Sequence, residues 1–492
     1  MPTSPPDAIL DSRIFTADDQ RFFAEASHDV NPMHMDPVAA RRLVSGRQVV
    51  HGVHTLLVAL EKWIERSGVV PSGVKCQFIN PVNVGDLVTF SQFPGDLGLD
   101  QASIVASVGD LPCAELSIDS TTADTMPTPV ASVEHSRGTV LPRLDRPLEM
   151  APVELAGMRF TLTDSQHQPL AQRFPHLADA LGLERLAAIA TLSQFVGMVC
   201  PGLHSVFSSV SLEFGGVVAT GSRLSFVVRK YDARFGLFII GVEGTLVGEI
   251  RAFLRPPPQA QASMDEVCGR VQRGEFDGHR TLVIGGSRGL GETVAKIVAA
   301  GGGDVIVSHA TGVADARRVA DEITLAGRGA CTTVHLDLTV SGFAEAGIEV
   351  ASLDTVYFFA TPRIFRKKTG RFDRMLFDEF ALFYLERFTE LCEWLEARAV
   401  GRPVTVYLPS TVFITERPRG MTEYAMVKAA AELLADDSNR SFRNVRIVHQ
   451  RLPRLATDQT ASIMKLATES PLEVLLPMVR QIHQTQTARL IS

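Results

Sequence analysis

Apolar residues in the first 125 positions follow two different periods. From Val50 to Ile64 they recur at steps of three and four, which predicts a long helix with one buried face. Patterns typical of strands cover 74–88, 101–108 and 113–120. A shorter helix is expected over 20–26, and residues 1–12 are expected to be a disordered lead-in. Together these elements predict one α+β domain over 1–125.

The same order of patterns returns after a connector, residues 126–150, that is rich in Pro, Arg and Asp. An apolar-faced helix is expected from Leu183 to Val199. The strands predicted after it cover 204–207, 209–214, 223–229, 237–242 and 244–254. Residues 126–255 are therefore predicted to form a second domain on the plan of the first. An unrelated α+β domain is the alternative.

A third pattern begins after three consecutive prolines, 256–258, which predict a linker over 256–278. Short apolar strands then alternate with helical stretches. The predicted strands cover 280–284, 304–308, 334–338, 355–359, 403–408 and 445–450. Alternation of this kind is typical of a doubly wound parallel sheet, here over 279–492.

Composition narrows the class of protein further. A chain of 492 residues suggests roughly two to four domains, and a net charge of −7 gives no reason to expect nucleic acid as a partner. The six cysteines are scattered, without the spacing of metal ligands, and indicate reduced thiols. No basic-then-apolar leader and no apolar run of about 18 residues is present, so we expect a cytoplasmic protein without a membrane span.

Acid–base residues gather in the segment 27–36. Asp29 and His34 flank Asn31 and Pro32, and proline disfavours helix immediately before it. We expect a rigid loop that brings the carboxylate and the imidazole to one side, where they can act on one water. The alternative is that Asp29 and Asn31 only cap turns and that His34 is a surface histidine.

Gly52 opens the next helix after a histidine, and a free backbone N–H there can stabilise developing negative charge. With it, the segment closely resembles the signature of the MaoC-like, R-specific enoyl-CoA hydratases and dehydratases, which have the hotdog fold. The residues that match this signature are Phe23, Ser27, Asp29, Asn31, Pro32, His34 and Ala40. His28 stands where the family usually has Gly, and Met33 where it has Leu, Ile or Val. The resemblance implies that Asp29 and His34 are the catalytic pair and that the Gly52 N–H binds the thioester oxygen.

The second domain holds no Asp-x-Asn-Pro-x-His string. The resemblance therefore implies a degenerate hotdog paired with the catalytic one. In double-hotdog hydratases the catalytic half is C-terminal, whereas here it is N-terminal. The expected fold class is multidomain: an α+β double hotdog followed by an α/β Rossmann-type doubly wound parallel sheet.

A glycine-rich turn, Gly285-Gly286-Ser287-Arg288-Gly289-Leu290-Gly291, joins the first strand of the third domain to the next helix. Its backbone amides can approach a pyrophosphate, helped by the helix dipole. Further along, Tyr424 and Lys428 share one helical face. They follow the hydroxyls of Ser410 and Thr411, which end a strand. The lysine can lower the pKa of the phenol so that it acts as an acid or base.

This combination resembles the short-chain dehydrogenase/reductase family over about 279–460. The resemblance implies that Tyr424 is the acid/base, that Lys428 tunes it and anchors the ribose, and that Ser410 binds the carbonyl. Thr411 is the close alternative for that last role. The residues implied at the cofactor are Gly285, Ser287, Arg288, Gly289, Leu290, Gly291, Asp337 and Lys428.

The second strand of this domain ends in 308–311, Ser-His-Ala-Thr, without the carboxylate that would bind the ribose 2′-OH of NAD. Arg288 and His309 can instead meet a 2′-phosphate, which favours NADP(H); the alternative is that Arg288 faces solvent. Departures from the family are Phe358-Phe359-Ala360-Thr361 for Asn-Asn-Ala-Gly, Tyr384 for a relay Asn, and Pro453-Arg454 for Pro-Gly. They keep open a slow, altered or purely structural reductase.

Together the motifs predict a bifunctional enzyme acting on an acyl thioester of CoA or an acyl carrier protein. NADPH would reduce a 3-oxoacyl group, and dehydration would follow, as in fatty-acid or polyketide assembly. The alternatives are the β-oxidation direction and a hydratase whose reductase-like domain only binds or dimerises. A hotdog thioesterase is disfavoured because the Asp-x-Asn-Pro-x-His string matches the hydratase pattern. We expect a homodimer, without a metal, nucleic acid or membrane partner.

Overall fold

The computed structural model describes residues 8–43, 46–93, 101–120, 138–162, 167–214, 224–340, 342–365, 372–399, 401–460 and 467–491. They form two compact units, one up to Pro257 and the other from Pro258 onward. Each unit has its own β-sheet. The first part of the predicted connector, residues 126–137, lies outside the described ranges.

The first unit is built on an 11-stranded sheet in the order β1-β3-β4-β5-β2-β8-β11-β10-β9-β7-β6. Its strands are β1 Ala8–Ile14, β2 Gly73–Phe78, β3 Leu87–Phe93, β4 Gln101–Val108, β5 Leu111–Asp119, β6 Thr139–Leu141, β7 Arg159–Leu162, β8 Ser205–Glu213, β9 Leu224–Asp232, β10 Leu237–Glu243 and β11 Val247–Leu254. Antiparallel pairing of β2 with β8, with Cys76 opposite Val210, joins two halves. Outward from this seam, β2-β5-β4-β3-β1 and β8-β11-β10-β9-β7 follow the same plan.

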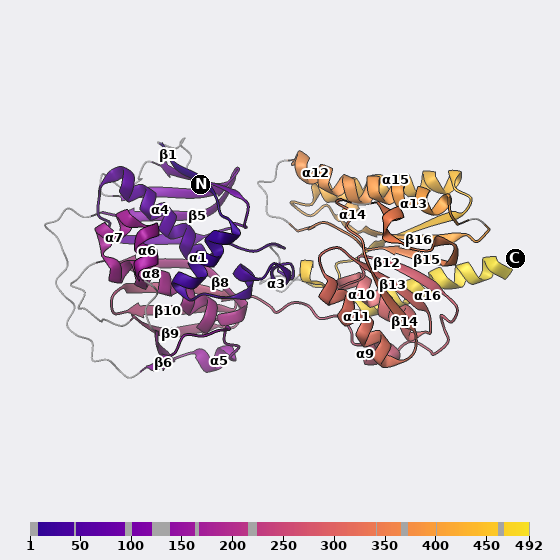
Figure 1. Ribbon diagram of the computed structural model, residues 1–492, viewed down its shortest axis with the longest axis horizontal. Helices are drawn as coiled ribbons and strands as arrows, with labels where there is room; N and C mark the ends of the chain where they lie inside the picture. The colour runs from indigo at the N-terminus through magenta and orange to yellow at the C-terminus, as the bar shows by residue number, and fades with distance from the viewer. Residues whose placement is uncertain are drawn as a thin grey trace. The chain divides into compact units, whose positions relative to one another are not determined.

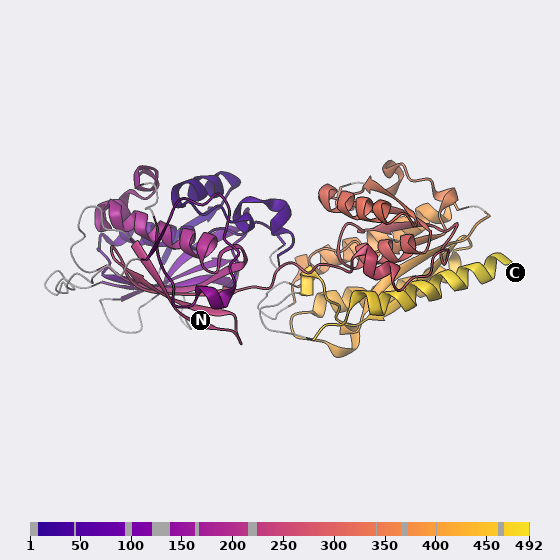
Figure 2. The ribbon, with the colours of Figure 1, turned by 90° about the horizontal axis from the view of Figure 1, so that it is seen from below.

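The helices of this unit lie on one face of the sheet (Figures 1 and 2). α4 (Gly52–Ser67) and α8 (Leu183–Gln194) are its long helices, and each precedes the seam strand of its half. The others are α1 Ala17–Ser27, α2 Pro32–Met35, α3 Pro37–Ala40, α5 Pro152–Leu155, α6 His167–Arg173 and α7 Pro175–Leu181. Leu57 of α4 and Ile189 of α8 belong to one core cluster that spans both halves. The predicted α+β double hotdog is confirmed.

Three local predictions are wrong in this unit. Residues 1–7 of the predicted lead-in lie outside the described ranges. Residues 8–14 form strand β1 at the sheet edge instead of a disordered segment, and half-burial gives that strand only a weak apolar pattern. Pro32 begins the short helix α2 instead of a loop, because the first helical position needs no hydrogen-bonded N–H. The two strands predicted over 204–214 are one strand, β8, with an irregularity between Phe207 and Ser209.

The second unit contains a six-stranded sheet in the order β14-β13-β12-β15-β16-β17, with neighbouring strands parallel. Its strands are β12 Arg280–Ile284, β13 Asp304–His309, β14 Ala330–His335, β15 Thr355–Phe358, β16 Val404–Thr411 and β17 Val445–Leu452. By position the order is 3-2-1-4-5-6, that of dinucleotide-binding doubly wound folds. The predicted doubly wound parallel sheet is confirmed.

Side chains of this sheet alternate between two helical layers. Leu282 and Ile284 of β12 belong to one core cluster, which includes residues of α12, α13 and α15, whereas Val283 joins another with residues of α10, α11 and α16. Figure 1 shows the two groups of helices on opposite faces of the sheet. The helices are α9 Met264–Cys268, α10 Gly289–Ala300, α11 Val313–Ala326, α12 Arg374–Ala381, α13 Phe388–Glu396, α14 Phe413–Glu416, α15 Thr422–Ser441 and α16 Pro471–Ile491.

The linker predicted over 256–278 is shorter than expected. Helix α9 begins at Met264 behind a capping box at Ser263, and Met264, Val267 and Phe276 are buried in the core of the second unit. The prolines mark a break, but the apolar residues that follow them are core positions. Strand β14 also ends earlier than predicted, at His335, so that Asp337 lies in the loop beyond it.

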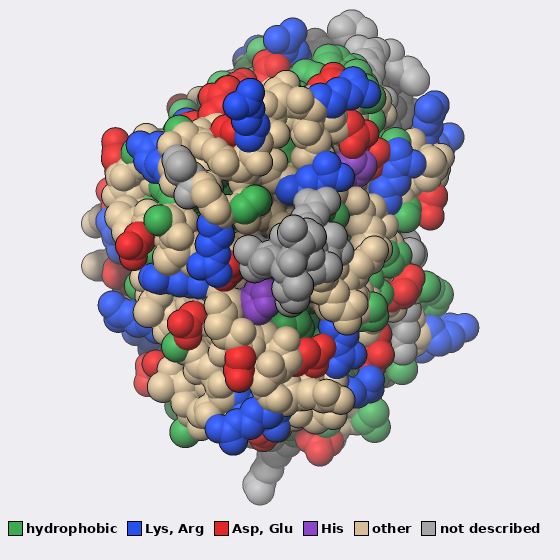
Figure 3. Space-filling model, turned by 90° about the vertical axis from the view of Figure 1, so that its right-hand side faces the viewer, with side chains coloured by type: hydrophobic (Ala, Val, Ile, Leu, Met, Phe, Trp, Pro, Cys, Tyr) green, Lys and Arg blue, Asp and Glu red, His purple; other side chains and the backbone are tan. Residues whose placement is uncertain are grey.

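The face shown in Figure 3 carries charged side chains of both signs. On the face shown in Figure 3, Lys and Arg side chains of the described residues are interspersed with Asp and Glu, instead of gathering into one basic patch. Within the described ranges, no helix has both the length and the apolar character that a membrane crossing requires.

Candidate active sites

Asp29 is placed by the end of helix α1. This helix begins with a capping box at Thr16 and ends at His28, whose φ of 64° lies in the left-handed region that favours glycine. The Ser27 hydroxyl donates to the Phe23 carbonyl at 2.6 Å and accepts from the Asp29 amide at 3.3 Å. The sharp turn at His28, which occupies the family's glycine position, leads directly into the buried Asp29.

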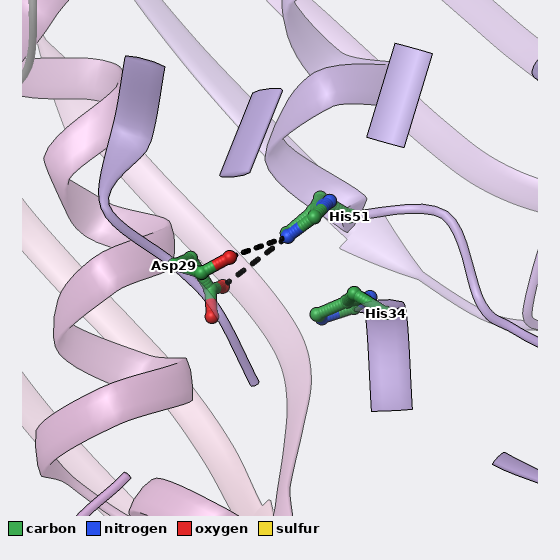
Figure 4. Close-up of side chains that lie close together, drawn as sticks. All are labelled: Asp29, His34 and His51. Atoms are coloured by element: carbon green, nitrogen blue, oxygen red, sulfur yellow. Dashed lines mark hydrogen bonds and ion pairs between the residues drawn. The ribbon is translucent and has the colours of Figure 1, made fainter. Parts of the chain in front are cut away.

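His34 lies beside Asp29 on the short helix α2 (Figure 4), which Asn31 caps. The Nδ1 atom of His34 lies 2.6 Å from the Val49 carbonyl, so it carries the proton and leaves Nε2 as the basic nitrogen. The His51 ring stacks on His34 with centroids 3.8 Å apart, and its Nε2 donates to the Asp29 carbonyl at 3.0 Å. The predicted pair, Asp29 and His34, thus meets at one buried site, together with His51, which was not predicted as a site residue.

These three side chains have ligand atoms within 4.8 Å of one another, a spacing that a metal ion also requires. The His34 and His51 rings are stacked, with an interplanar angle of 23°. The His51 nitrogen nearest Asp29 also carries the proton that it donates to the Asp29 carbonyl. A protonated nitrogen cannot ligate a metal ion, so this arrangement fits acid–base chemistry better than metal coordination.

The second half of the double hotdog completes this site. Helix α8 contributes Ser193, whose hydroxyl donates to Asp29 Oδ2 at 2.7 Å. The chain continues from α8 in a π-helical turn, Phe195–Val199. In that turn, a Cβ added at Gly197 would lie 2.3 Å from Asp29 Oδ1. The Asn31 amide donates to the Gly197 carbonyl at 2.7 Å. Sequence reasoning missed Ser193 and Gly197; the one available signal was a glycine inside a predicted apolar helix.

Burial sets the proton affinities of the first site. It raises the pKa of Asp29, against the effects of His34, of the Ser193 hydrogen bond and of the Asn31 amide, which lower it. Burial lowers the pKa of His34, against the effects of Asp29 and Val49, which raise it. The pKa values of the carboxyl and the imidazole therefore move towards each other, which favours proton exchange between them and a substrate.

Gly52 is the first residue of helix α4, and His51 is its N-cap without a side-chain capping bond. The amides of a first helical turn have no acceptor within their own helix. A Cβ at Gly52 would lie 3.1 Å from the Phe78 ring, so the backbone passes close to this aromatic wall. The role of the Gly52 N–H as an oxyanion donor stays a prediction.

The glycine-rich turn of the second unit has the tight packing that a phosphate cradle needs. Gly285 has a φ of 78°, and a Cβ there would lie 2.7 Å from the Ala360 amide nitrogen. A Cβ at Gly291 would lie 2.4 Å from the Gly285 carbonyl oxygen. The Ser308 hydroxyl accepts from the Gly285 amide at 3.0 Å. The predicted Ser287 precedes helix α10, and Gly289 and Leu290 lie in its first turn.

Arg288 and Asp337, two predicted cofactor residues, already have partners. Arg288 is the half-buried N-cap residue of α10 and lies 3.5 Å from an Asp458 carboxylate oxygen. It therefore does not simply face solvent. Asp337 accepts from the Thr339 amide at 2.9 Å and from its hydroxyl, which lowers the pKa of Asp337.

The prediction that Ser410 binds the carbonyl is corrected by the structure. The Ser410 hydroxyl donates to Glu432 at 2.5 Å, and Glu432 is also paired with Arg451. Thr411, the next residue of β16, is hydrogen-bonded to the Tyr424 phenol. Side chains of successive strand residues point to opposite faces, so only one of the two hydroxyls can reach the tyrosine. Thr411, the alternative weighed from the sequence, is that residue.

Tyr424 and Lys428 lie on helix α15, as predicted, but their electrostatics differ from the expectation. Burial raises the pKa of Tyr424, against the opposing hydrogen bonds from Thr411 and Tyr384. Burial also lowers the pKa of Lys428 to about 7. The Lys428 ammonium donates to the Pro409 carbonyl at 2.6 Å. The expected lowering of the phenol pKa by the lysine is not found.

Tyr384 occupies the place expected for the relay Asn. It lies in a π-helical segment, Leu382–Arg387, and is hydrogen-bonded to both Thr361 and Tyr424. The Lys428 Nζ lies 3.5 Å from the centroid of the Tyr384 ring. Thr361, Tyr384, Tyr424 and Thr411 thus form a chain of hydroxyls.

The second unit contains a cavity of about 560 Å³, which residues near the ends of strands β16 and β17 help to line. Its lining residues are Phe365, Val412, Phe413, Glu416, Pro418, Arg419, Met421, Pro453, Arg454, Ala467, Thr468 and Glu469. The Phe413 ring contacts the Tyr424 ring, with centroids 6.4 Å apart. Tyr424 itself does not line the cavity, but it packs directly behind one of the rings that do.

Comparison with known proteins identifies the N-terminal segment. The family model for the MaoC like domain matches residues 3–93, a range that includes Asp29, His34 and Gly52. The mitochondrial 3-hydroxyacyl-[acyl-carrier-protein] dehydratase of Arabidopsis thaliana is 33% identical over 99 residues, which cover 20% of this chain and 54% of the relative. The match thus spans about half the length of that curated relative. The chain contains a MaoC-like domain at its N-terminal end.

Solved structures similar to the chain include short-chain dehydrogenases and reductases. One from Burkholderia cenocepacia, in complex with NADP, is 22% identical with a TM-score of 0.36, covering 42% of this chain and 92% of that one. A 3-oxoacyl (acyl-carrier-protein) reductase from Agrobacterium tumefaciens with NADP bound is 21% identical with a TM-score of 0.34, covering 37% and 73%. The strand order of the second unit defines its Rossmann-type class without them.

Proposed function

We propose that the chain is a bifunctional enzyme on acyl thioesters of CoA or an acyl carrier protein, and that its first unit interconverts 3-hydroxyacyl and trans-2-enoyl thioesters. The observation that carries this proposal is the buried pair of Asp29 and His34, which contacts His51 at the start of helix α4, inside a MaoC-like domain. The Arabidopsis relative is a 3-hydroxyacyl-[acyl-carrier-protein] dehydratase, which supports a thioester substrate.

In the dehydration direction, C2 of the acyl chain loses a proton and the C3 hydroxyl leaves as water. His34 Nε2 and the Asp29 carboxyl are the groups placed to take the first proton and give the second. The thioester oxygen gains negative charge as C2 loses its proton, and the Gly52 N–H would stabilise it. Ser193 and Gly197 would hold the Asp29 carboxyl in one position during both transfers.

The second unit would reduce a 3-oxoacyl thioester to the 3-hydroxyacyl form consumed by the first. When bound, the nicotinamide cofactor would supply the hydride that attacks C3. Thr411 would position the carbonyl oxygen, and Tyr424 would donate the proton to that oxygen. The raised pKa of Tyr424 keeps the phenol protonated, which is the form that reduction requires. Linking the two activities would raise the effective concentration of the intermediate at the second site.

The residues present fit a dinucleotide with a 2′-phosphate, so we propose NADP(H). The glycine-rich turn at Gly285 and Gly291 would receive the pyrophosphate. Strand β13 ends at His309 without the carboxylate that would bind a ribose 2′-OH. Arg288 would exchange Asp458 for the 2′-phosphate, and Asp337 would contact the adenine from the loop beyond β14. NADP(H) favours the reductive direction.

The test follows NADPH oxidation with acetoacetyl-CoA and identifies the acyl product by mass. Wild type, Tyr424→Phe and Asp29→Asn are compared, with Asp36→Asn as a matched control because Asn caps a helix as well as Asp does. Tyr424→Phe should abolish NADPH oxidation. Asp29→Asn should still oxidise NADPH but accumulate the 3-hydroxyacyl product. Enoyl product from Asp29→Asn would contradict the role of Asp29, and NADPH oxidation by Tyr424→Phe would contradict that of Tyr424.

A second candidate function is a hydratase whose second unit binds nucleotide without turnover. The lowered pKa of Lys428 weakens its positive charge near neutrality, and its hydrogen bond to Pro409 occupies one of its protons. Both favour this alternative, because such a lysine is less able to anchor a ribose. Stoichiometric NADPH binding without oxidation on any 3-oxoacyl thioester, together with hydration of crotonyl-CoA, would support it. Hydration followed by oxidation, the β-oxidation direction, is tested by the reverse assay with NADP⁺.

A further inference from the structure

Arg454 is the feature of the second unit that its proposed chemistry does not use. It follows strand β17 and lines the cavity that Phe413 also lines. Its guanidinium lies over the Phe365 ring, with Cζ 5.1 Å from the centroid. The Phe365 and Phe413 rings are in contact, with centroids 6.2 Å apart, and the Phe413 ring in turn contacts the Tyr424 ring. A row of aromatic rings thus connects the guanidinium to the predicted acid/base residue.

The Arg454 guanidinium has no hydrogen-bond or salt-bridge partner among the described residues, and its Nε is shielded from solvent without an acceptor. A shielded donor without an acceptor costs free energy, and native structures almost always satisfy such groups. The other charged residues of the cavity, Glu416, Arg419 and Glu469, are exposed at its margin, where solvent screens them. A ligand with a hydrogen-bond acceptor would therefore satisfy the Arg454 guanidinium.

The geometry of the group narrows the class of ligand. A guanidinium over an aromatic ring can still donate from its N–H groups, and their fork matches the paired oxygens of a phosphate or carboxylate. The remaining wall of the cavity is largely apolar, with Val412, Phe413 and Met421 beside Phe365. Such a wall suits an acyl chain or the arm that carries it.

We propose that Arg454 binds an anionic group of the reductase substrate, and so selects substrates in which a phosphate or carboxylate accompanies the 3-oxoacyl group. This inference rests on the proposed reductase function of the same cavity. Two sources can supply the anion: the phosphate of the phosphopantetheine arm, which CoA and acyl carrier proteins share, or a carboxylate at the end of the acyl chain.

Kinetics with three substrates separate these sources. The substrates are acetoacetyl-CoA, the uncharged N-acetylcysteamine thioester of acetoacetate, and an N-acetylcysteamine thioester whose 3-oxoacyl chain ends in a carboxylate. Arg454→Met should raise KM by roughly 10- to 100-fold for the substrate with the recognised anion, while kcat stays close to wild type. KM for the uncharged thioester should not change. Arg454→Lys should recover part of the loss.

Arg419→Met is the matched control, because Arg419 lines the same cavity but is exposed. It should leave all three KM values close to those of wild type. A KM in Arg454→Met that rises equally for the charged and uncharged thioesters would assign Arg454 a structural role and overturn the proposal. Unchanged KM values for all three substrates would overturn it as well.

A binding measurement keeps this inference separate from the proposed function. Calorimetric titration of the full chain with 4′-phosphopantetheine, and separately with glutarate, needs no turnover. If wild type oxidises no NADPH with any substrate, the proposed reductase function fails. Binding of either anion that Arg454→Met abolishes would still support the site. Absence of binding to wild type by both probes would overturn it.

Discussion

The two candidate sites of this chain are assembled in opposite ways. At the first, Asp29 and His34 come from one half of the double hotdog, while Ser193 and Gly197 of the other half hold the carboxyl. At the second, a single Rossmann-type fold supplies every group: strand β16 ends with Thr411, and helix α15 carries the acid/base pair. Sequence motifs within one fold therefore indicate the second site. The motif of the first site includes Asp29 and His34 but not the residues of the other half that hold the carboxyl.

Electrostatics show the same contrast. Burial raises the pKa of Asp29, and one of the groups that oppose it, Ser193, belongs to the other half of the unit. Burial also raises the pKa of Tyr424, but the opposing hydroxyls of Thr411 and Tyr384 belong to the same fold. Substitutions in the second hotdog half should therefore impair the activity of the first site, although they lie far along the chain from its motif. The reductase site should respond only to residues of its own unit.

Gly197→Ala should break this arrangement most severely. The added Cβ would lie 2.3 Å from Asp29 Oδ1, so the carboxyl must leave its position. Hydration of crotonyl-CoA should fall roughly 10²- to 10⁴-fold, the usual contribution of a positioned acid–base group. NADPH binding and oxidation in the second unit should be unaffected, which distinguishes local displacement from general unfolding.

Gly269→Ala serves as the matched control for that substitution. A Cβ at Gly269 would meet its nearest atom at 3.4 Å, an ordinary contact. Both activities should survive in this variant. Wild-type hydration by Gly197→Ala would show that the π-helical turn does not constrain Asp29.

Thr411→Val should sharpen the description of the second site. It removes the hydroxyl bound to Tyr424 but keeps the shape and strand preference of the side chain. Reduction of acetoacetyl-CoA should fall roughly 10²-fold, as when one donor to a developing oxyanion is lost. Ser410→Ala should have little effect, because that hydroxyl is engaged with Glu432. A larger loss in Ser410→Ala than in Thr411→Val would restore the original assignment.

Ser193→Ala should have the smallest effect. Its hydrogen bond lowers the pKa of Asp29, so removing it raises that pKa further. A carboxylate with a higher pKa ionises at higher pH, and the acid limb of the hydratase pH profile should move upward. Near that limb, activity should fall roughly tenfold. Thr191→Ser, which keeps a hydroxyl bound within α8, should leave the profile in place. A profile that Ser193→Ala does not move would contradict the coupling.

Sequence reasoning reached the elements whose signals are local. The strand–turn–helix at Gly285 and the helical pair of Tyr424 and Lys428 each occupy one continuous stretch, and the structure places them as predicted. The segment around Asp29 and His34 was equally accessible, because its residues converge within one loop and a short helix.

Long-range information was out of reach of the sequence. Ser193 contacts Asp29 across 164 positions of the chain, and no spacing rule links them. The choice between Ser410 and Thr411 depended on which face of β16 meets helix α15, a matter of packing. The electrostatics of Lys428 depend on burial, which periodicity does not measure.

The continuous seam between β2 and β8 has a consequence for symmetry. Two identical hotdog subunits related by a two-fold axis would have two equivalent sites. Each subunit would then supply the acid–base residues of one site and the supporting residues of the other. Here the two halves are joined in one chain, and the second lacks the acid–base string. The first half therefore supplies the acid–base residues and the second half the residues that hold Asp29. The surface that the second half presents to Asp29 can then be shaped to one substrate alone.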